Sequence, residues 1–252
     1  MRIAVLIKAA RALPDAPDRL PALAPGDAAA LAWAAALAGD DDETIAITAG
    51  PASADPALER ALDHGVHRAM RIWVPDPDVQ LLDANVRGVA ELLAATVRHV
   101  APIDLVLCGA RSADWSTGIT GPAVAFELDV PHVSFLSSIQ RVEEQPDADG
   151  QAQPTIRFVQ HHDTHLLECE LRLPALLSVI SAPAKLVEGN RRSGAAIEVL
   201  MADEVGFEAD DPLPWPALPT VPEEGGAQRV GGKELLALLQ PKSDTNDGAD
   251  LP

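Results

Sequence analysis

Tyrosine is absent from this chain of 252 residues, and Phe and Trp contribute only four residues each. Aromatic residues therefore make up 3% of the sequence, although apolar residues as a whole make up 47%. We expect Ala-rich helices and Val- and Ile-rich strands to fill the core instead. A chain of this length fits one large α/β domain, with or without appended segments.

Basic residues are also scarce, since 19 Lys and Arg stand against 38 Asp and Glu and give a formal net charge of −19. This balance argues against nucleic acid as a partner, because the chain has no basic face to neutralise phosphates. It argues equally against an anionic membrane surface. No apolar run is long enough to cross a bilayer, so we expect no membrane insertion.

The chain has only two cysteines, Cys108 and Cys169, which are far apart in the sequence. They form neither a metal-binding motif nor a disulfide framework, which predicts a reducing, cytoplasmic location. The apolar run at residues 3–7 is too short for a signal peptide and lacks a cleavage site, so we interpret it as the first core strand.

Short apolar runs alternate with helical patterns through the first half of the chain. The expected strands are residues 3–7, 44–48, 69–74 and 105–108, and the expected helices are 28–38, 56–64, 81–99 and 122–128. Asp27 and Asp55 have the side chains of N-caps for the first two helices. The alternation predicts an α/β fold with an open, mostly parallel sheet and helices on both faces, of the adenine-nucleotide-binding type.

The pattern changes after Pro131. Alternating segments predict an antiparallel extension, and an apolar strand then returns to the core; they cover residues 132–144, 156–162, 165–173 and 174–180. Residues 201–252 are acidic and rich in Pro and Gly, which predicts an extended arm with one short helix at 232–239 and a disordered tail. We therefore divide the chain into an α/β domain at residues 1–200 and this arm.

Three loops rich in small residues follow expected strands, beginning at Lys8, Ala49 and Gly109. The carboxyl ends of parallel strands share one edge of a sheet, where ligands of such folds bind. The loop at 109–121 enters a helix, which is a phosphate-binding layout, although an ordinary strand-to-helix connection has the same pattern. The spacing is neither that of a dinucleotide fingerprint nor that of a P-loop.

Two catalytic or metal-binding interpretations are weaker. His161, Asp163 and His165 share one face of a strand, but outer-sheet positions explain them as well as a metal does. Asp114 and His132 suggest a hydrolase pair, yet the nucleophile elbow GxSxG is absent. We expect neither a metal nor catalysis by this chain alone.

Several segments resemble, in order, the β subunit of electron-transfer flavoproteins, over roughly residues 1–180. They are residues 3–8 with Pro14-Asp15, the turn Ala49-Gly50-Pro51, and residues 61–68, 105–131 and 171–174. The resemblance implies a partner, the larger α subunit, which holds most of the FAD. It also implies a β-subunit pocket that commonly holds AMP, or a second FAD in bifurcating members. Such a pair carries electrons from a flavin dehydrogenase to a respiratory or other acceptor.

The chain departs from this family at three places. Gly118 and Ile119 replace an Asn and a Gln of the phosphate loop, whereas Thr120 and Gly121 are retained. Residues 23–28 lack the family's aromatic residue and its Glu. The recognition loop is reduced to residues 181–194, so we expect a dehydrogenase partner other than an acyl-CoA dehydrogenase.

The motifs and the resemblance together give the expected site residues. The cofactor-binding set is Leu6, Lys8, Ala49, Gly50, Gly109, Ser112, Asp114, Ser116, Thr117, Gly118, Ile119, Thr120 and Gly121. The partner-docking set is Lys185, Arg191, Arg192, Leu235 and Leu236, although the basic residues also fit an ordinary solvated loop. An alternative function on the same fold is a stand-alone regulatory module that binds an adenine nucleotide.

Overall fold

The computed structural model describes residues 1–9, 23–74, 86–112, 116–142, 154–162, 165–183 and 191–207. The chain divides into the units Met1–Ala209 and Asp210–Pro252, and all described residues belong to the first. The predicted helix at 232–239 and the predicted disordered tail lie outside the described residues.

The described part forms one nine-stranded sheet with the order β7-β6-β5-β8-β4-β1-β2-β3-β9. The strands are β1 (Arg2–Leu6), β2 (Glu43–Gly50), β3 (Arg68–Trp73), β4 (Leu105–Gly109), β5 (His132–Val142), β6 (Thr155–His162), β7 (His165–Arg172), β8 (Ala175–Val179) and β9 (Ile197–Leu200). Pairing is parallel from β9 through β8 to β5, and β6 and β7 add an antiparallel hairpin. The predicted mostly parallel α/β sheet with an antiparallel extension is thus confirmed.

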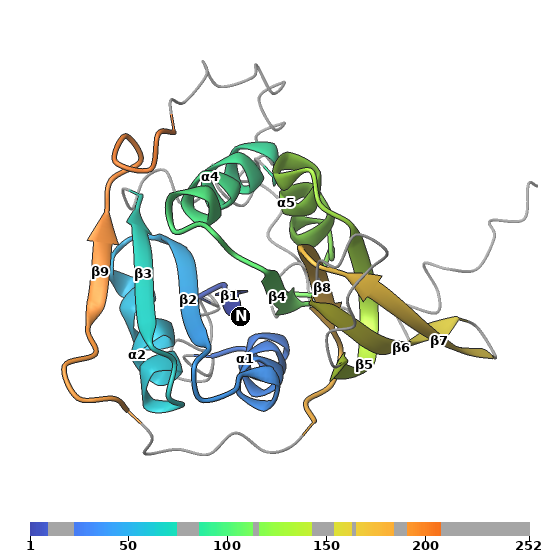
Figure 1. Ribbon diagram of the computed structural model, residues 1–252. Helices are drawn as coiled ribbons and strands as arrows, with labels where there is room; N and C mark the ends of the chain where they lie inside the picture. The colour runs from blue at the N-terminus through green and yellow to red at the C-terminus, as the bar shows by residue number, and fades with distance from the viewer. Residues whose placement is uncertain are drawn as a thin grey trace, which may run out of the picture. The chain divides into compact units, whose positions relative to one another are not determined.

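Helices cover both faces of the sheet (Figure 1). They are α1 (Pro25–Leu37), α2 (Asp55–Asp63), α4 (Val86–His99) and α5 (Thr120–Leu128), with a short 3₁₀ turn at Ala52–Ala54. Buried residues of α1 and α2 pack on one face, and those of α4 and α5 on the other. Ile3 and Val5 of β1 have no exposed surface, and burying each such side chain contributes about 1.5–3 kcal/mol.

Two predicted helix caps are wrong. α1 begins at Pro25 rather than at residue 28, because proline at the first helical positions presets the backbone angle. Asp27 therefore lies inside the first turn, where its Oδ2 accepts the Lys8 N–H at 3.1 Å. Asp55 likewise lies inside α2, and its carboxylate pairs with Arg71 at 2.6 Å.

Strand β9 was not expected from the sequence, which placed residues 181–198 in a basic loop. Its residues pair in parallel with β3, from Ala69↔Ile197 to Ile72↔Leu200. Arg68 reinforces the pairing with two hydrogen bonds of 2.8 Å to the Glu198 carboxylate. The sheet therefore ends on a strand at the proposed boundary near residue 200, and the division into domain and arm stays a prediction.

Candidate functional site

The three loops rich in small residues leave neighbouring strands, since β4, β1 and β2 are adjacent in the sheet. The chain changes direction at β1, with β2 and β3 on one side and β4 and β8 on the other (Figure 1). Open parallel sheets bind ligands outside the strand ends at such a switch point. The structure therefore brings the three loops that hold the predicted cofactor-binding set to one edge, and the binding role of the set stays a prediction. Asp114 lies outside the described residues.

The ends of β1 and β2 are held by buried contacts. The Leu6 side chain is 5% exposed and belongs to the core, so only its backbone faces the edge. The carbonyl of Gly50 accepts a hydrogen bond of 3.2 Å from Arg71, which is itself buried and paired with Asp55. The end of β2 at Ala49 and Gly50 is thereby fixed to the start of α2.

Gly109, at the end of β4, packs its backbone directly on Gly26 of α1. A Cβ on Gly109 would lie 2.8 Å from the carbonyl carbon of Gly26. A Cβ on Gly26 would lie 3.1 Å from the Arg111 carbonyl oxygen and 3.3 Å from the Gly109 Cα. Glycine is therefore required at position 109 for the packing of α1 against β4, and its predicted role in cofactor binding is a separate one.

The loop before α5 exposes hydroxyl groups at this edge. Ser116 and Gly118 have positive φ angles of 51° and 68°, and a Cβ on Gly118 would lie 2.9 Å from the Ala110 carbonyl oxygen. Ser116 is tied to Ser112, since its Oγ donates to the Ser112 carbonyl at 2.9 Å. Thr117, Ile119 and Thr120 are exposed, and no side chain caps α5, so its first N–H groups face this edge without a cap.

Gly121 is buried in α5 and points away from the loop surface. A Cβ there would lie 2.8 Å from Ser178 Oγ and 3.0 Å from Cys108 Sγ. Ser178 also contacts His132 Nε2 at 2.9 Å and Cys108 Sγ at 3.2 Å. Burial lowers the pKa of His132 and raises the pKa of Cys108 to about 11.

This His132–Ser178 pair does not form a hydrolase site. Ser178 is only 3% exposed, so a substrate has no access to its hydroxyl group. Gly121 therefore packs on this buried polar group, and its place in the predicted cofactor-binding set stays a prediction.

Sequence reasoning missed Arg111 and Phe135 at the same edge. The Arg111 guanidinium carbon lies 5.4 Å from the centroid of the Phe135 ring. Phe135 has φ 60° where the register of β5 shifts, and it is 38% exposed. Ile119, in the loop after β4, and Ile180, directly after β8, follow strands that end at this edge and are 49% and 48% exposed. A non-glycine residue at positive φ has no signal in the sequence, which is why this apolar rim was not foreseen.

The predicted docking arginines lie elsewhere and have intramolecular partners. Arg191 pairs with Glu59 at 2.5 Å and with Asp63 at 3.6 Å, both on α2. Arg192 donates through Nε to the Gly65 carbonyl at 3.3 Å. Lys185, Leu235 and Leu236 lie outside the described residues. The docking role of this set stays a prediction.

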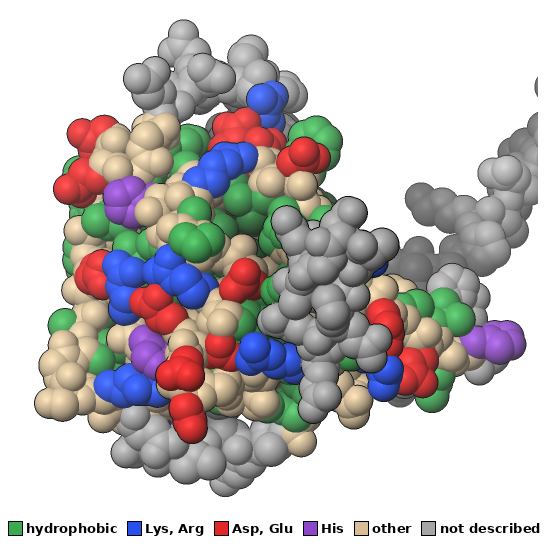
Figure 2. All heavy atoms as spheres, viewed as in Figure 1, with side chains coloured by type: hydrophobic (Ala, Val, Ile, Leu, Met, Phe, Trp, Pro, Cys, Tyr) green, Lys and Arg blue, Asp and Glu red, His purple; other side chains and the backbone are tan. Residues whose placement is uncertain are grey.

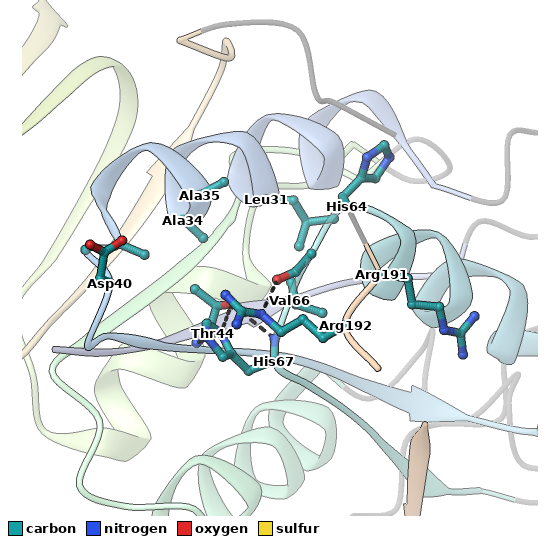
Figure 3. Close-up of a pocket in the computed structure, with 13 residues that line it drawn as sticks. Leu31, Ala34, Ala35, Asp40, Thr44, His64, Val66, His67, Arg191 and Arg192 are labelled. Atoms are coloured by element: carbon teal, nitrogen blue, oxygen red, sulfur yellow. Dashed lines mark hydrogen bonds between the residues drawn. The ribbon is translucent and has the colours of Figure 1, made fainter. Parts of the chain in front are cut away.

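A cavity of about 610 Å³ lies beside these arginines, at the amino ends of β2 and β3 (Figure 3). It is therefore at the opposite edge of the sheet from the predicted nucleotide site. Its lining comes from α1 and the turn after it, from β2, from residues 64–67 and from Arg191 and Arg192. The sequence predicted partner docking at Arg191 and Arg192 but no cavity beside them.

The surface carries charges of both signs. On the face in Figure 2, Lys and Arg side chains alternate with Asp and Glu and form no separate basic area. No group of three or more His, Cys, Asp or Glu suited to a metal occurs among the described residues, and the side chains of His161, His162 and Asp163 lie outside them. No helix in the described ranges is long and apolar enough to cross a membrane.

Similar proteins were found by two comparisons. The electron transfer flavoprotein domain matches residues 19–205. Protein FixA of Bradyrhizobium diazoefficiens is 24% identical over 164 residues, which cover 64% of this chain and 51% of that protein. The caffeyl-CoA reductase-Etf complex subunit CarD of Acetobacterium woodii is 28% identical over 161 residues, 62% of this chain and 60% of that protein.

An electron transfer flavoprotein subunit beta, that of Sus scrofa, aligns over more of its length. It is 28% identical over 213 residues, 79% of this chain and 75% of that protein. The chain spans about half to three fifths of the FixA and CarD proteins. Because the domain match covers well over half of the sequence, the chain belongs to the electron transfer flavoprotein family and is of its β-subunit type.

Proposed function

We propose that this chain is the β subunit of a heterodimeric electron-transfer flavoprotein. With an α subunit, it carries electrons from a flavin dehydrogenase to a respiratory or other acceptor. The observation that carries the proposal is the domain match at residues 19–205, which includes the loops at the carboxyl ends of β2 and β4. The chain acts as a carrier subunit and catalyses no reaction alone.

The carboxyl edge fits the phosphate of AMP. The first turn of α5 has no side-chain cap, so its N–H groups and the positive end of the helix are suited to an anion. Exposed Thr117 and Thr120 add hydroxyl donors beside it. We place AMP here, with its phosphate at residues 117–120.

FAD lies mainly on the α subunit in this proposal. When bound, it supplies the acceptance and release of electrons, which no side chain of this chain supplies. The exposed apolar side chains of Ile119, Phe135 and Ile180 are suited to exclude water at a contact with a partner subunit. Arg111, which lies over the Phe135 ring, adds a positive charge at the same contact.

A partner surface is also supported at the outer strand of the hairpin. β7 is the last strand of the sheet among the described residues, and Leu166 and Leu167 on it are 65% and 44% exposed. Exposed apolar residues on an edge strand favour a covering partner. Both cysteines are free thiols, which supports the cytoplasm as the location.

The identity of the dehydrogenase is proposed only by exclusion. The basic segment is short, and the structure gives Arg191 and Arg192 partners at the end of α2. We therefore propose a flavin dehydrogenase outside the acyl-CoA class.

The experiment is a transfer assay with the assembled pair. The chain and an α subunit are purified together, and a reduced flavin dehydrogenase is added while flavin absorbance is followed. Bleaching of the flavin, followed by recovery when an acceptor is added, supports the carrier role. A chain that binds AMP tightly, forms no complex with any α subunit and alters a regulatory target instead supports the stand-alone module.

A further inference from the structure

The cavity at the amino edge has one apolar wall (Figure 3). Leu31, Ala34, Ala35 and Ala38, all at the carboxyl-terminal half of α1 or directly after it, provide this wall. Alanine side chains leave a flat helix surface, and the cavity of about 610 Å³ is large enough for a small organic molecule.

The facing wall holds a histidine in one fixed tautomer. His67 Nδ1 accepts the Thr44 backbone N–H at 3.0 Å and lies 2.9 Å from the Thr44 hydroxyl. Because Nδ1 is an acceptor, the ring proton is on Nε2, which remains a donor. Thr44 is buried, so this orientation is set by the start of β2.

Arg192 places a positive charge next to this histidine. Figure 3 shows its side chain extending across the cavity toward Thr44 and His67, whereas that of Arg191 points away. Within the described ranges, Arg192 forms one hydrogen bond, from Nε to the Gly65 carbonyl oxygen. Its two terminal nitrogens can therefore donate to a ligand. No carboxylate of the described residues forms an ion pair with it, although the chain has twice as many acidic as basic residues.

We propose that this cavity binds a small organic carboxylate with an apolar body. The Arg192 guanidinium matches the planar carboxylate, His67 Nε2–H adds a neutral donor, and the α1 wall contacts the apolar part. A single negative charge suits the site better than a phosphate dianion, because Asp40 is also on its lining and Glu43 acts electrostatically on His67.

The position of the cavity separates this proposal from the electron-carrier role. AMP is placed at the carboxyl edge, and this site is at the amino edge, so either proposal stands if the other fails. The ligand would also act on His67, whose pKa is lowered by burial and by the charge of Arg192. A bound carboxylate raises that pKa because it compensates the positive charge.

The test uses benzoate as the probe and the full chain in low salt. We expect saturable shifts of the His67 ring signals in NMR spectra, with a Kd on the order of 1 mM or below. Arg192→Gln should weaken binding by about tenfold or more, because it removes a charge-assisted interaction. Arg87→Gln, at an exposed position of α4 that does not line the cavity, is the matched control and should change the Kd by less than about twofold.

A second variant and two analogues of benzoate test the apolar wall and the charge separately. Ala35→Phe, at an exposed helix position on the lining, should obstruct the apolar wall and weaken binding without altering the unfolding temperature. Benzyl alcohol, which lacks the charge, and acetate, which lacks the apolar body, should both bind more weakly than benzoate. The proposal is overturned if benzoate does not bind saturably, if Arg192→Gln binds it unchanged, or if acetate binds equally well.

Discussion

Gly109 and Gly26 meet backbone to backbone, so that a side chain on Gly109 has no room: its Cβ would lie 2.8 Å from the Gly26 carbonyl carbon. The contact joins the end of β4 to the first turn of α1. The contact fixes the position of the point at which the predicted nucleotide-binding loop leaves β4.

Gly109→Ala should therefore destabilise the fold. Overpacking against backbone costs about 1–3 kcal/mol, since neither glycine has a flexible end that can move aside. Urea unfolding monitored by circular dichroism measures the change. Gly39→Ala is the control, because its nearest atoms would be 3.6 and 3.9 Å from the new Cβ, and it should change stability by less than about 0.5 kcal/mol.

Asp42 should make stability depend on pH. Burial alone would raise its pKa, but hydrogen bonds from the Met1 ammonium group and the Gly39 N–H, with the charge of Arg141, lower it. A carboxylate with a lowered folded-state pKa stabilises the protein above the usual Asp pKa, and this contribution is lost as the pH falls through the lowered value.

Asp42→Asn should consequently lower the free energy of unfolding by about 2 kcal/mol at pH 7. The difference from the original chain should shrink as the pH falls from about 5 toward 2. Thermal unfolding across this range measures it. Asp41→Asn, at the exposed neighbouring position, should have little effect at any pH, and an equal loss there would contradict the assignment to Asp42.

The two thiols should react at different rates. Cys108 is buried with a pKa of about 11, whereas Cys169 is partly exposed. At pH 8 only about one Cys108 in a thousand is the reactive thiolate. Mass spectrometry after iodoacetamide treatment should show Cys169 modified first and Cys108 only after unfolding. Equal labelling of both in the folded protein would contradict the burial of Cys108.

We expect the hydroxyl groups of Thr117 and Thr120 to contribute to the affinity for AMP. Replacing Thr117 and Thr120 together by Val removes two exposed hydroxyl groups and preserves shape, so AMP affinity should fall about tenfold. Adenosine, which lacks the phosphate, should bind equally to both forms. Unchanged AMP affinity in calorimetry would show that these hydroxyls do not hold the phosphate. Gly121 is unsuited to this test, because its added side chain would meet Ser178 and Cys108 first.

Local patterns predicted most of the sheet. The apolar runs that became β1 and β4 are buried on both faces, and this is how parallel strands appear in a sequence. β9 was missed because it is four half-exposed residues at the sheet edge, and its partner β3 lies more than a hundred residues earlier.

The candidate site was predictable only in part. The loops at Lys8, Ala49 and Gly109 were placed together correctly, since parallel strands share their carboxyl edge. The roles of individual glycines depend on what packs against them, and this is settled by Gly26 and Ser178 from other elements. The cavity at the amino edge is lined by α1, His67 and Arg192, which come from distant parts of the chain, so no local sequence pattern predicted it.

The most direct test of the central claim is whether this chain completes a flavin-binding complex. The purified chain is mixed with a candidate α subunit and FAD, and gel filtration is monitored at a protein and a flavin wavelength. The account predicts one peak that contains both subunits and bound flavin. Elution of the chain as a separate, flavin-free species with every plausible α subunit would contradict it.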